Sequence, residues 1–349
     1  MALWWFYGMA KSAAAESRKP PRIQKHAELV TGHQRLAVRN AIEQGARRII
    51  AVAQRKGGSG KTTCARTICE LAAIPEAYGI PTLGIDFDSQ CSLSKLYLRM
   101  EAADTEDALT RPPLHPDFDP ETDSGDWDGR SSSADLFFGD GGVTPYPVTR
   151  IQGVGTLDLL PGNVAKLIEV EEHDRTYLAD RVQNRLRDWA NQPDVRTAYP
   201  LIVIDTAPSD HPLTRAALRA ATHLLIPVTM EQQGIDGLHE MLSLWRQENS
   251  RRTEEDMLQI IAIQPNLVSS GSLHTGFYDS LRKNPAFAPY LAPFVIKRRQ
   301  AIAERDVRGL RPNSIFHMAP SDETRQMMVK FANFVIGKAF LPEGQGDER

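Results

Sequence analysis

The stretch that decides the fold is KGGSGKTT, residues 56–63. It follows an apolar run at residues 48–53 and precedes a segment with helical periodicity at residues 62–73. A glycine-rich turn between a strand and a helix lets the backbone fold around an anion, with successive amide groups directed inward. The amino end of the helix adds partial positive charge. This context predicts a loop that binds the phosphates of a nucleotide.

Two side chains of this loop carry its chemistry. Lys61 is expected to reach the β- and γ-phosphates of ATP, and the hydroxyl of Thr62 is expected to bind Mg²⁺. Where the standard loop has a glycine, six positions before its lysine, this chain has Arg55, and a second lysine precedes the glycine pair. The ATP-binding residues expected in the loop are Lys56, Gly57, Gly58, Ser59, Gly60, Lys61, Thr62 and Thr63.

Apolar runs alternate with helical patterns along most of the chain. The expected strands are residues 48–53, 81–86, 157–160, 201–205, 223–228, 258–263 and 294–296. The expected helices lie within residues 33–47, 62–73, 164–190, 230–249, 272–283 and 322–338, the last capped by Ser321. Continuous apolar strands that alternate with helices predict an α/β fold of three layers, a mostly parallel sheet with helices on both faces, of the P-loop NTPase type.

Two of the expected strands end in carboxylates. Asp205 follows the apolar residues 201–204, a pattern typical of a residue that holds Mg²⁺ through bound water. Asp86 ends the strand at residues 81–86, and Asp88 follows two residues later. We expect Thr62, Asp86 and Asp205 to form the metal site. Asp88 is expected to face the γ-phosphate, although a turn aspartate that makes only local backbone bonds is the alternative.

The loop with two lysines is similar to the deviant Walker A loop of the ParA/MinD superfamily. The resemblance covers roughly residues 48–340 outside an acidic insert, and further segments that carry it are GIDFDSQ (84–90), LLPGN (159–163), IPV (226–228) and GIDGL (234–238). It implies a P-loop ATPase in which Lys56, Lys61 and Asp88 are the catalytic residues. Lys56 would act across an ATP-sandwiched homodimer and Asp88 would help to hold the attacking water. Pro265 and Asn266 would contact adenine.

A basic segment, VIKRR at residues 295–299, also resembles the family. The resemblance implies that Lys297, Arg298 and Arg299 bind DNA without sequence preference in the ATP dimer. Arg305, Arg308 and Arg311 follow closely and would extend a basic stripe. Such a stripe releases counterions from DNA, so binding should weaken steeply with salt. The chain has a net charge of −3, and a solvated charged face is therefore the alternative.

The expected organisation has three parts. Residues 1–46 form an N-terminal extension, partly disordered with one helix, in which Met9 is an alternative start. Residues 47–340 form the ATPase domain, interrupted at about 101–135 by an acidic loop rich in Asp, Glu, Pro, Ser and Gly. That composition favours a solvated excursion, with a partner contact as the alternative. Residues 341–349 form a polar tail.

The function that these features imply is partition of plasmid or chromosomal DNA by a Mg²⁺- and ATP-dependent ATPase. The resemblance implies non-specific DNA and a ParB-like centromere-binding protein as partners, the latter stimulating hydrolysis, and a cytoplasmic, nucleoid-associated location. A MinD-like membrane-associated positioning ATPase is the alternative. It needs a basic amphipathic helix at the carboxyl end, where this chain is acidic and polar, so we expect no stable membrane association.

A reductase related to the nitrogenase iron protein is a further alternative. Such a protein needs a cysteine from each chain to bridge an iron–sulfur cluster. The three cysteines, Cys64, Cys69 and Cys91, all precede residue 92 and have no metal-site spacing, so we expect them to be small buried thiols.

Overall fold

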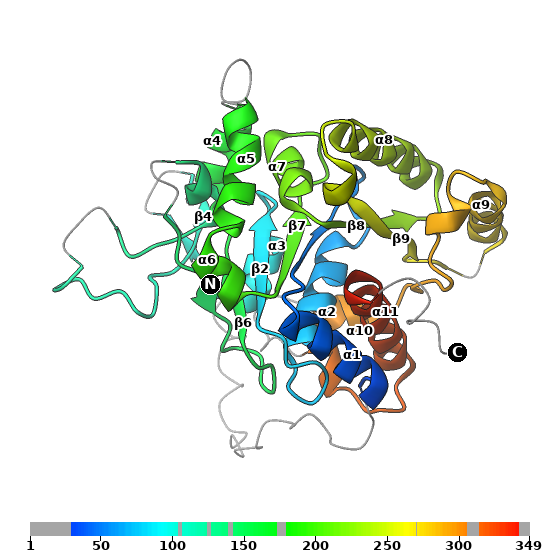
Figure 1. Cartoon of the computed structure of the whole chain (residues 1–349), viewed down its shortest axis with the longest axis horizontal. Helices are drawn as coiled ribbons and strands as arrows, with labels where there is room; N and C mark the ends of the chain where they lie inside the picture. Colours follow the sequence, from blue (N-terminus) through cyan, green and yellow to red (C-terminus); the bar gives the residue numbers. More distant parts are fainter. Residues whose placement is uncertain are drawn as a thin grey trace, which may run out of the picture.

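The computed structural model describes residues 29–103, 107–123, 127–138, 142–172, 179–269, 271–305 and 314–341, with the backbone alone for 179–182 and 304–305. Its main feature is a seven-stranded sheet in the order β5-β6-β2-β7-β1-β8-β9 (Figure 1). The strands are β1 (Arg48–Val52), β2 (Thr82–Phe87), β5 (Tyr146–Pro147), β6 (Leu157–Leu160), β7 (Leu201–Thr206), β8 (His223–Thr229) and β9 (Gln259–Asn266). All neighbours are parallel except β5 and β6.

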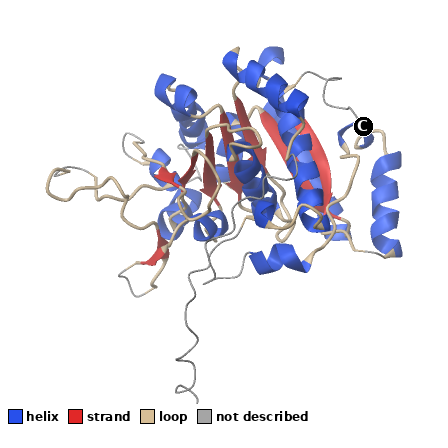
Figure 2. Ribbon diagram, turned by 90° about the horizontal axis from the view of Figure 1, so that it is seen from below, coloured by secondary structure: helices blue, strands red, loops and turns tan. Residues whose placement is uncertain are grey.

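Helices cover both faces of this sheet (Figure 2). They are α1 (Gly32–Glu43), α2 (Lys61–Ala73), α3 (Ser92–Tyr97), α4 (Val164–Glu172), α5 (Ala179–Ala190), α6 (Pro193–Ala198), α7 (Pro212–Ala220), α8 (Gln232–Asn249), α9 (Ser272–Lys283), α10 (Gln300–Arg305) and α11 (Glu323–Phe340). Side chains alternate along each strand, so Ile50 and Val52 of β1 pack in the core under α2 and α11, while Ile49 and Ala51 pack in the core under α7 and α8. The expected three-layer α/β fold is confirmed.

The parallel strands place the candidate site residues at one edge of the sheet. In the register of the sheet, Val52 at the end of β1 lies opposite Asp205 of β7, and Asp86 of β2 lies opposite Asp205 on the other side. The loop at residues 56–63 leaves the same edge and runs into α2. In open α/β sheets, ligands bind outside the carboxyl ends of the strands, which is this edge.

Several expected element bounds are wrong. Residues 294–296 form no strand of the sheet; Ile296 instead joins the end of β9 through single bonds, donating to Pro265 O and accepting from Val268 N. Helix α11 is capped by Asp322 and not by Ser321, because the Asp322 carboxylate accepts bonds from the two amides at the start of the helix. Helix α7 had no counterpart among the expected helices.

The acidic stretch at residues 101–135 is less open than its composition indicates. Its described part includes a two-stranded hairpin of β3 (Glu101–Ala102) and β4 (Thr110–Arg111) and a 3₁₀ turn at Ser133–Phe137. His115 is buried against Tyr146, with ring centroids 4.6 Å apart, and bonds Pro145 O through Nε2 at 3.1 Å. His115 and residues 131–134 are therefore buried where a solvated excursion was expected, while much of the stretch between them is exposed. A few aromatic residues among the acidic residues supply enough apolar surface for the segment to pack against the domain.

A buried ion pair fixes α2, the helix that follows the glycine loop. Arg66 Nε lies 2.5 Å from Glu70 Oε1, and both side chains are fully buried. Ser314 Oγ donates a further bond of 2.5 Å to Glu70 Oε2, which ties the helix to the segment before α11. A buried charge that loses its partner is costly because neither water nor another group replaces the lost interaction.

We predict that Glu70→Gln lowers the free energy of unfolding by roughly 3 kcal/mol, because it removes the negative charge that the buried Arg66 guanidinium faces at 2.5 Å. Urea unfolding followed by circular dichroism measures this. The control is Glu43→Gln in the exposed pair of Arg39 and Glu43, which has the same spacing and should change stability by less than about 0.5 kcal/mol. Equal effects of the two variants would contradict the account of α2.

Candidate functional site

The loop at residues 56–63 has the backbone that anion binding needs. Gly58 and Gly60 have φ values of 72° and 84°, in the left-handed region that favours glycine. Gly60 stands at the amino end of α2, which begins at Lys61. The first turn of α2 therefore directs its free amides toward the loop.

Neighbouring segments hold the loop closely. Asn266 at the end of β9 donates from Nδ2 to Ser59 O at 2.7 Å, and a Cβ on Gly60 would lie 2.3 Å from that nitrogen. Gln54 is fully buried, and its Oε1 accepts a hydrogen bond of 2.7 Å from the amide of Arg55. This contact of Gln54 with the start of the loop was not predicted from the sequence. A polar residue at the end of an otherwise apolar strand was the signal that could have indicated it.

Gly237 lies in the segment GIDGL (234–238), which carries part of the family resemblance, and its close contacts show why a glycine stands there. A Cβ on Gly237 would lie 2.9 Å from Gln54 Oε1 and 3.3 Å from Lys56 N. Helix α8 therefore approaches the beginning of the loop more closely than a larger residue allows.

Lys61 and Asp205 form the buried centre of the site. Lys61 is 6% exposed and Asp205 is fully buried. Burial lowers the pKa of Lys61, while Asp205 and Asp88 act in the opposite direction. Burial and the nearby Asp86 raise the pKa of Asp205 well above its usual range, and the Thr62 hydroxyl and Lys61 partly offset this. Thr62, Lys61 and three aspartates are thus brought together at one edge of the sheet.

The three aspartates differ in the number of hydrogen bonds that their carboxylate oxygens accept. Asp86 accepts from the amide and the hydroxyl of Ser94, at 2.8 and 2.7 Å, and from the amide of Asp88 at 3.1 Å. Burial raises the pKa of Asp86 to about 6. Asp88 is half-buried and accepts one local bond, from Gln90 N at 2.9 Å. In the described part of the chain, no donor meets the geometry of a full hydrogen bond at either carboxylate oxygen of Asp205, although the Thr62 hydroxyl lies close enough to lower its pKa.

This pattern fits a cation at Asp205. A buried carboxylate with so little hydrogen bonding needs a counter-charge, and the Thr62 hydroxyl beside it supplies a second oxygen of the kind Mg²⁺ prefers. Within the described ranges, no group of three or more His, Cys, Asp or Glu residues is arranged to hold a metal. Mg²⁺ keeps several waters and uses substrate phosphates as ligands, so few protein ligands suffice. The role of Asp86 as a direct metal ligand stays a prediction. Its carboxylate oxygens already accept three hydrogen bonds within the protein.

The two basic residues at the start of the loop differ. Arg55 is held by acidic residues, with Nε 3.2 Å from Glu240 Oε2 and Nη1 3.7 Å from Asp210 Oδ2. The Lys56 side chain is half-buried and makes no ion pair within the part of the chain that the structure describes. Lys56 is therefore free to reach another group.

The residues expected to bind DNA lie near the end of β9. Lys297 and Arg298 are exposed, and Arg298 N donates to Val268 O at 3.0 Å. Arg299 forms an ion pair with Glu323 at 2.7 Å, which reduces its positive charge toward a ligand. The side chain of Arg305 and all of Arg308 and Arg311 lie outside the described residues, so the stripe that they would extend is not placed.

A family model described as an AAA domain matches residues 47–260. The chain belongs to this AAA domain family. A protein described as replication protein A from Rhizobium rhizogenes is 28% identical over 200 residues, 56% of this chain and 43% of that protein. The sporulation initiation inhibitor protein Soj of Bacillus subtilis is 27% identical over 200 residues, 57% of this chain and 65% of Soj. The chain thus spans less than two thirds of the length of each of these relatives.

Solved structures show the same AAA-family fold. Apo McdA from Cyanthece has a TM-score of 0.59 at 18% identity, covering 82% of this chain and 98% of McdA. A plasmid partition protein from Borrelia burgdorferi has a TM-score of 0.53 at 18% identity, covering 82% and 97%. Cobyrinic acid a,c-diamide synthase from Mycobacterium smegmatis with ADP and magnesium has a TM-score of 0.50 at 23% identity, covering 74% and 92%.

Together with the family match, these likenesses confirm the recognition of a ParA-type ATPase. The synthase shows that the fold also serves another chemistry, so the fold alone does not determine function. Among the residues placed by the structure, none of the helices has the length and apolar character needed to cross a bilayer. All three cysteines are buried thiols that form no disulfide, as expected.

We predict that Asp205→Asn stabilises the protein in the absence of nucleotide and metal, by roughly 1–3 kcal/mol at pH 8, the cost of an unsatisfied buried polar group. Since the folded pKa of Asp205 is raised, the cost is absent below the unfolded pKa and grows as pH rises. The gain should therefore be larger at pH 8 than at pH 5, and Lys61 keeps Asp88 as a counter-charge.

Thermal unfolding in EDTA at the two pH values measures this gain. Asp279→Asn on exposed α9 is the control and should have no effect at either pH. A destabilised Asp205→Asn at pH 8 would show that the carboxylate has a partner that the account lacks.

Proposed function

We propose that the chain is a Mg²⁺- and ATP-dependent partition ATPase. The observation that carries this is the buried, unpartnered Asp205 carboxylate beside Lys61 and Thr62, at the end of a loop built for phosphates. A nucleotide with Mg²⁺ supplies both missing charges at once, the anion for Lys61 and the cation for Asp205. The relatives, replication and sporulation proteins, and the fold of a plasmid partition protein support this choice.

Each site residue has a part in the proposed reaction. The amides of the loop and Lys61 bind and orient the phosphates, and Thr62 and Asp205 hold Mg²⁺, which when bound neutralises charge on the β- and γ-phosphates. Asp88 positions the attacking water. Phosphoryl transfer depends mainly on alignment and charge, so this positioning suffices for slow hydrolysis. Asp86 supports the strand end through its bonds to Ser94.

Lys56 is proposed to complete the site of a second copy. Its side chain is half-buried and makes no ion pair among the described residues, and the next two residues in the loop, Gly57 and Gly58, are exposed. In an ATP-bound homodimer, it would reach the partner's nucleotide. Pro265 and Asn266 remain candidates for adenine contacts; Asn266 in this structure bonds the loop at Ser59.

The larger organisation is part of the same proposal. Residues 47–340 form the ATPase domain with the insert at about 101–135, residues 1–46 an extension, and residues 341–349 a tail. In the ATP dimer, Lys297 and Arg298 bind DNA without sequence preference, and a ParB-like partner stimulates hydrolysis. The protein then acts at the nucleoid on a plasmid or chromosome.

The proposed site predicts different defects for two variants. Lys61→Ala should lose ATP hydrolysis because it removes the ammonium that orients the phosphates. Asp88→Ala should still bind ATP and form dimers but hydrolyse at least tenfold more slowly, since it removes only the positioning of water. Phosphate release measures turnover, and size-exclusion chromatography with ATP measures dimers. Asp279→Ala on α9 is the control and should behave as the parent does. Parental turnover by Asp88→Ala would remove Asp88 from the reaction.

The DNA surface gives a separate prediction. Arg298→Glu should weaken ATP-dependent retention of non-specific DNA at least tenfold and leave ATP hydrolysis without DNA unchanged, because Arg298 is exposed and distant in sequence from the loop. Filter binding at several salt concentrations measures retention. Arg282→Glu, an exposed charge reversal on α9, is the control and should retain DNA as the parent does. Unchanged retention by Arg298→Glu at low salt would refute this DNA surface.

A further inference from the structure

A second candidate site lies at the opposite edge of the sheet, where the parallel strands begin. A pocket of about 280 Å³ opens between the start of β1, the start of β8 and the carboxyl ends of α5, α7 and α8. Six arginines line it, namely Arg47, Arg48, Arg187, Arg196, Arg219 and Arg252. The one carboxylate in its lining is Asp256. A pocket with this charge is not explained by the proposed ATPase reaction.

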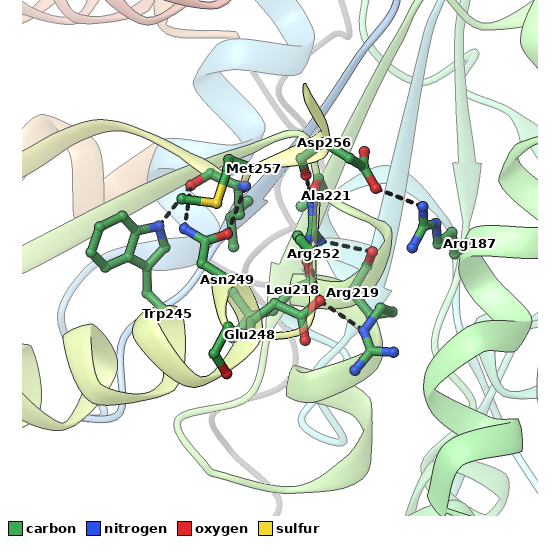
Figure 3. A network of polar contacts seen from close by, with 12 residues as sticks. Arg187, Leu218, Arg219, Ala221, Trp245, Glu248, Asn249, Arg252, Asp256 and Met257 are labelled. Atoms are coloured by element: carbon green, nitrogen blue, oxygen red, sulfur yellow. Dashed lines mark hydrogen bonds and ion pairs between the residues drawn. The ribbon is translucent and has the colours of Figure 1, made fainter. Parts of the chain in front are cut away.

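Half of these arginines have acidic partners (Figure 3). Arg187 pairs with Asp256 at 2.6 Å. Arg219 and Arg252 share Glu248, at 2.7 and 3.0 Å. Arg252 also donates to the carbonyls of Leu218, Arg219, Ala221 and Asp256, at 2.5, 2.9, 3.0 and 2.9 Å. Arg252 therefore caps the carboxyl end of α7 and connects α7 to α8. Its role is structural.

The other three arginines have no acidic partner among the described residues. Arg47 Nε donates to Tyr199 O at 3.3 Å, Arg48 Nη1 to Arg47 O at 2.9 Å, and Arg196 Nη1 to the side-chain oxygen of Asn191 at 3.3 Å. Arg48 also donates to Ala339 O and packs over Phe340. These neutral acceptors satisfy part of the hydrogen-bonding capacity but none of the charge.

Among the arginines that line the pocket, two guanidinium nitrogens are buried without an acceptor in the described residues. They are Nη2 of Arg47 and Nη2 of Arg219. Burial and the like charge of Arg196 lower the pKa of Arg47 to about 10, so the two guanidinium groups repel each other across the pocket. An anion in the pocket would lie among the guanidinium groups of Arg47, Arg196 and Arg219 and relieve this repulsion.

We propose that this pocket binds a small phosphate-bearing anion, held by Arg47, Arg196 and Arg219. Arginine donates two parallel bonds to phosphate oxygens, which makes it suited to this ligand class. The volume lies at the lower limit of ligand pockets and favours a pyrophosphate-sized group. The five residues of β1 span roughly 17 Å between this pocket and the glycine loop, so the two phosphate sites are distinct.

The test uses the full-length chain carrying Lys61→Ala, which weakens the loop site, and inorganic pyrophosphate as the probe. Calorimetry should show pyrophosphate binding to this protein. Adding Arg196→Glu should weaken the binding at least tenfold, because the new carboxylate pairs with Arg47 and repels the anion. Arg196 is exposed, so its change should leave the unfolding temperature intact. The matched control is Arg251→Glu, an exposed arginine outside the pocket lining, which should bind as its parent does.

A second variant, Arg47→Gln, should weaken the same binding while an unchanged circular dichroism spectrum shows that it folds. Short duplex DNA with ATP is a parallel arm in the protein that keeps Lys61, in which Arg196→Glu alone should retain DNA as the unmodified protein does. Three results would overturn the proposal. They are loss of all pyrophosphate binding in Lys61→Ala, equal binding with and without Arg196→Glu, and a loss of DNA retention in Arg196→Glu with pyrophosphate binding unchanged.

Discussion

The charge on Asp205 is the constraint on which the rest of the site depends. Its carboxylate is fully buried, no described donor bonds either oxygen, and Asp86 and Asp88 add negative charge nearby. Lys61 opposes this charge but is itself desolvated. A folded protein retains such a cluster only if something offsets its cost, and a metal-bound polyphosphate offsets both the missing cation and the missing anion. The fold thus places together the charges that such a ligand would complement.

The parallel sheet is what concentrates these groups. Residues 61, 86 and 205 are far apart along the chain, yet β1, β7 and β2 end at one edge and bring them together. The opposite edge collects the beginnings of strands and the ends of helices. There, arginines cap carbonyls and leave more positive charge than the nearby carboxylates balance. One topology therefore places the proposed site for phosphate and metal at one edge and a candidate anion pocket at the other.

The sequence predicted what local patterns encode. The loop at residues 56–63, the strand that ends at Asp205 and the three-layer fold follow from spacing, glycine content and continuous apolar runs. Contacts between distant segments were not predictable in this way. The bond from Asn266 to Ser59, the docking of His115 on Tyr146 and the pairing of Arg219 with Glu248 each join residues whose neighbours in the sequence give no sign of the other. Residues 294–296 likewise form no strand. Ile296 bonds singly to Pro265 and Val268, an arrangement set by the end of β9 and not by local propensity.

Calorimetric titration of the parent protein with ATP, with Mg²⁺ and with EDTA, tests the central claim most directly. If Asp205 and Lys61 are balanced for a metal-bound nucleotide, ATP should bind at one site per chain, and Mg²⁺ should strengthen the binding. Absence of ATP binding in both conditions, or affinity that does not respond to Mg²⁺, would contradict the account.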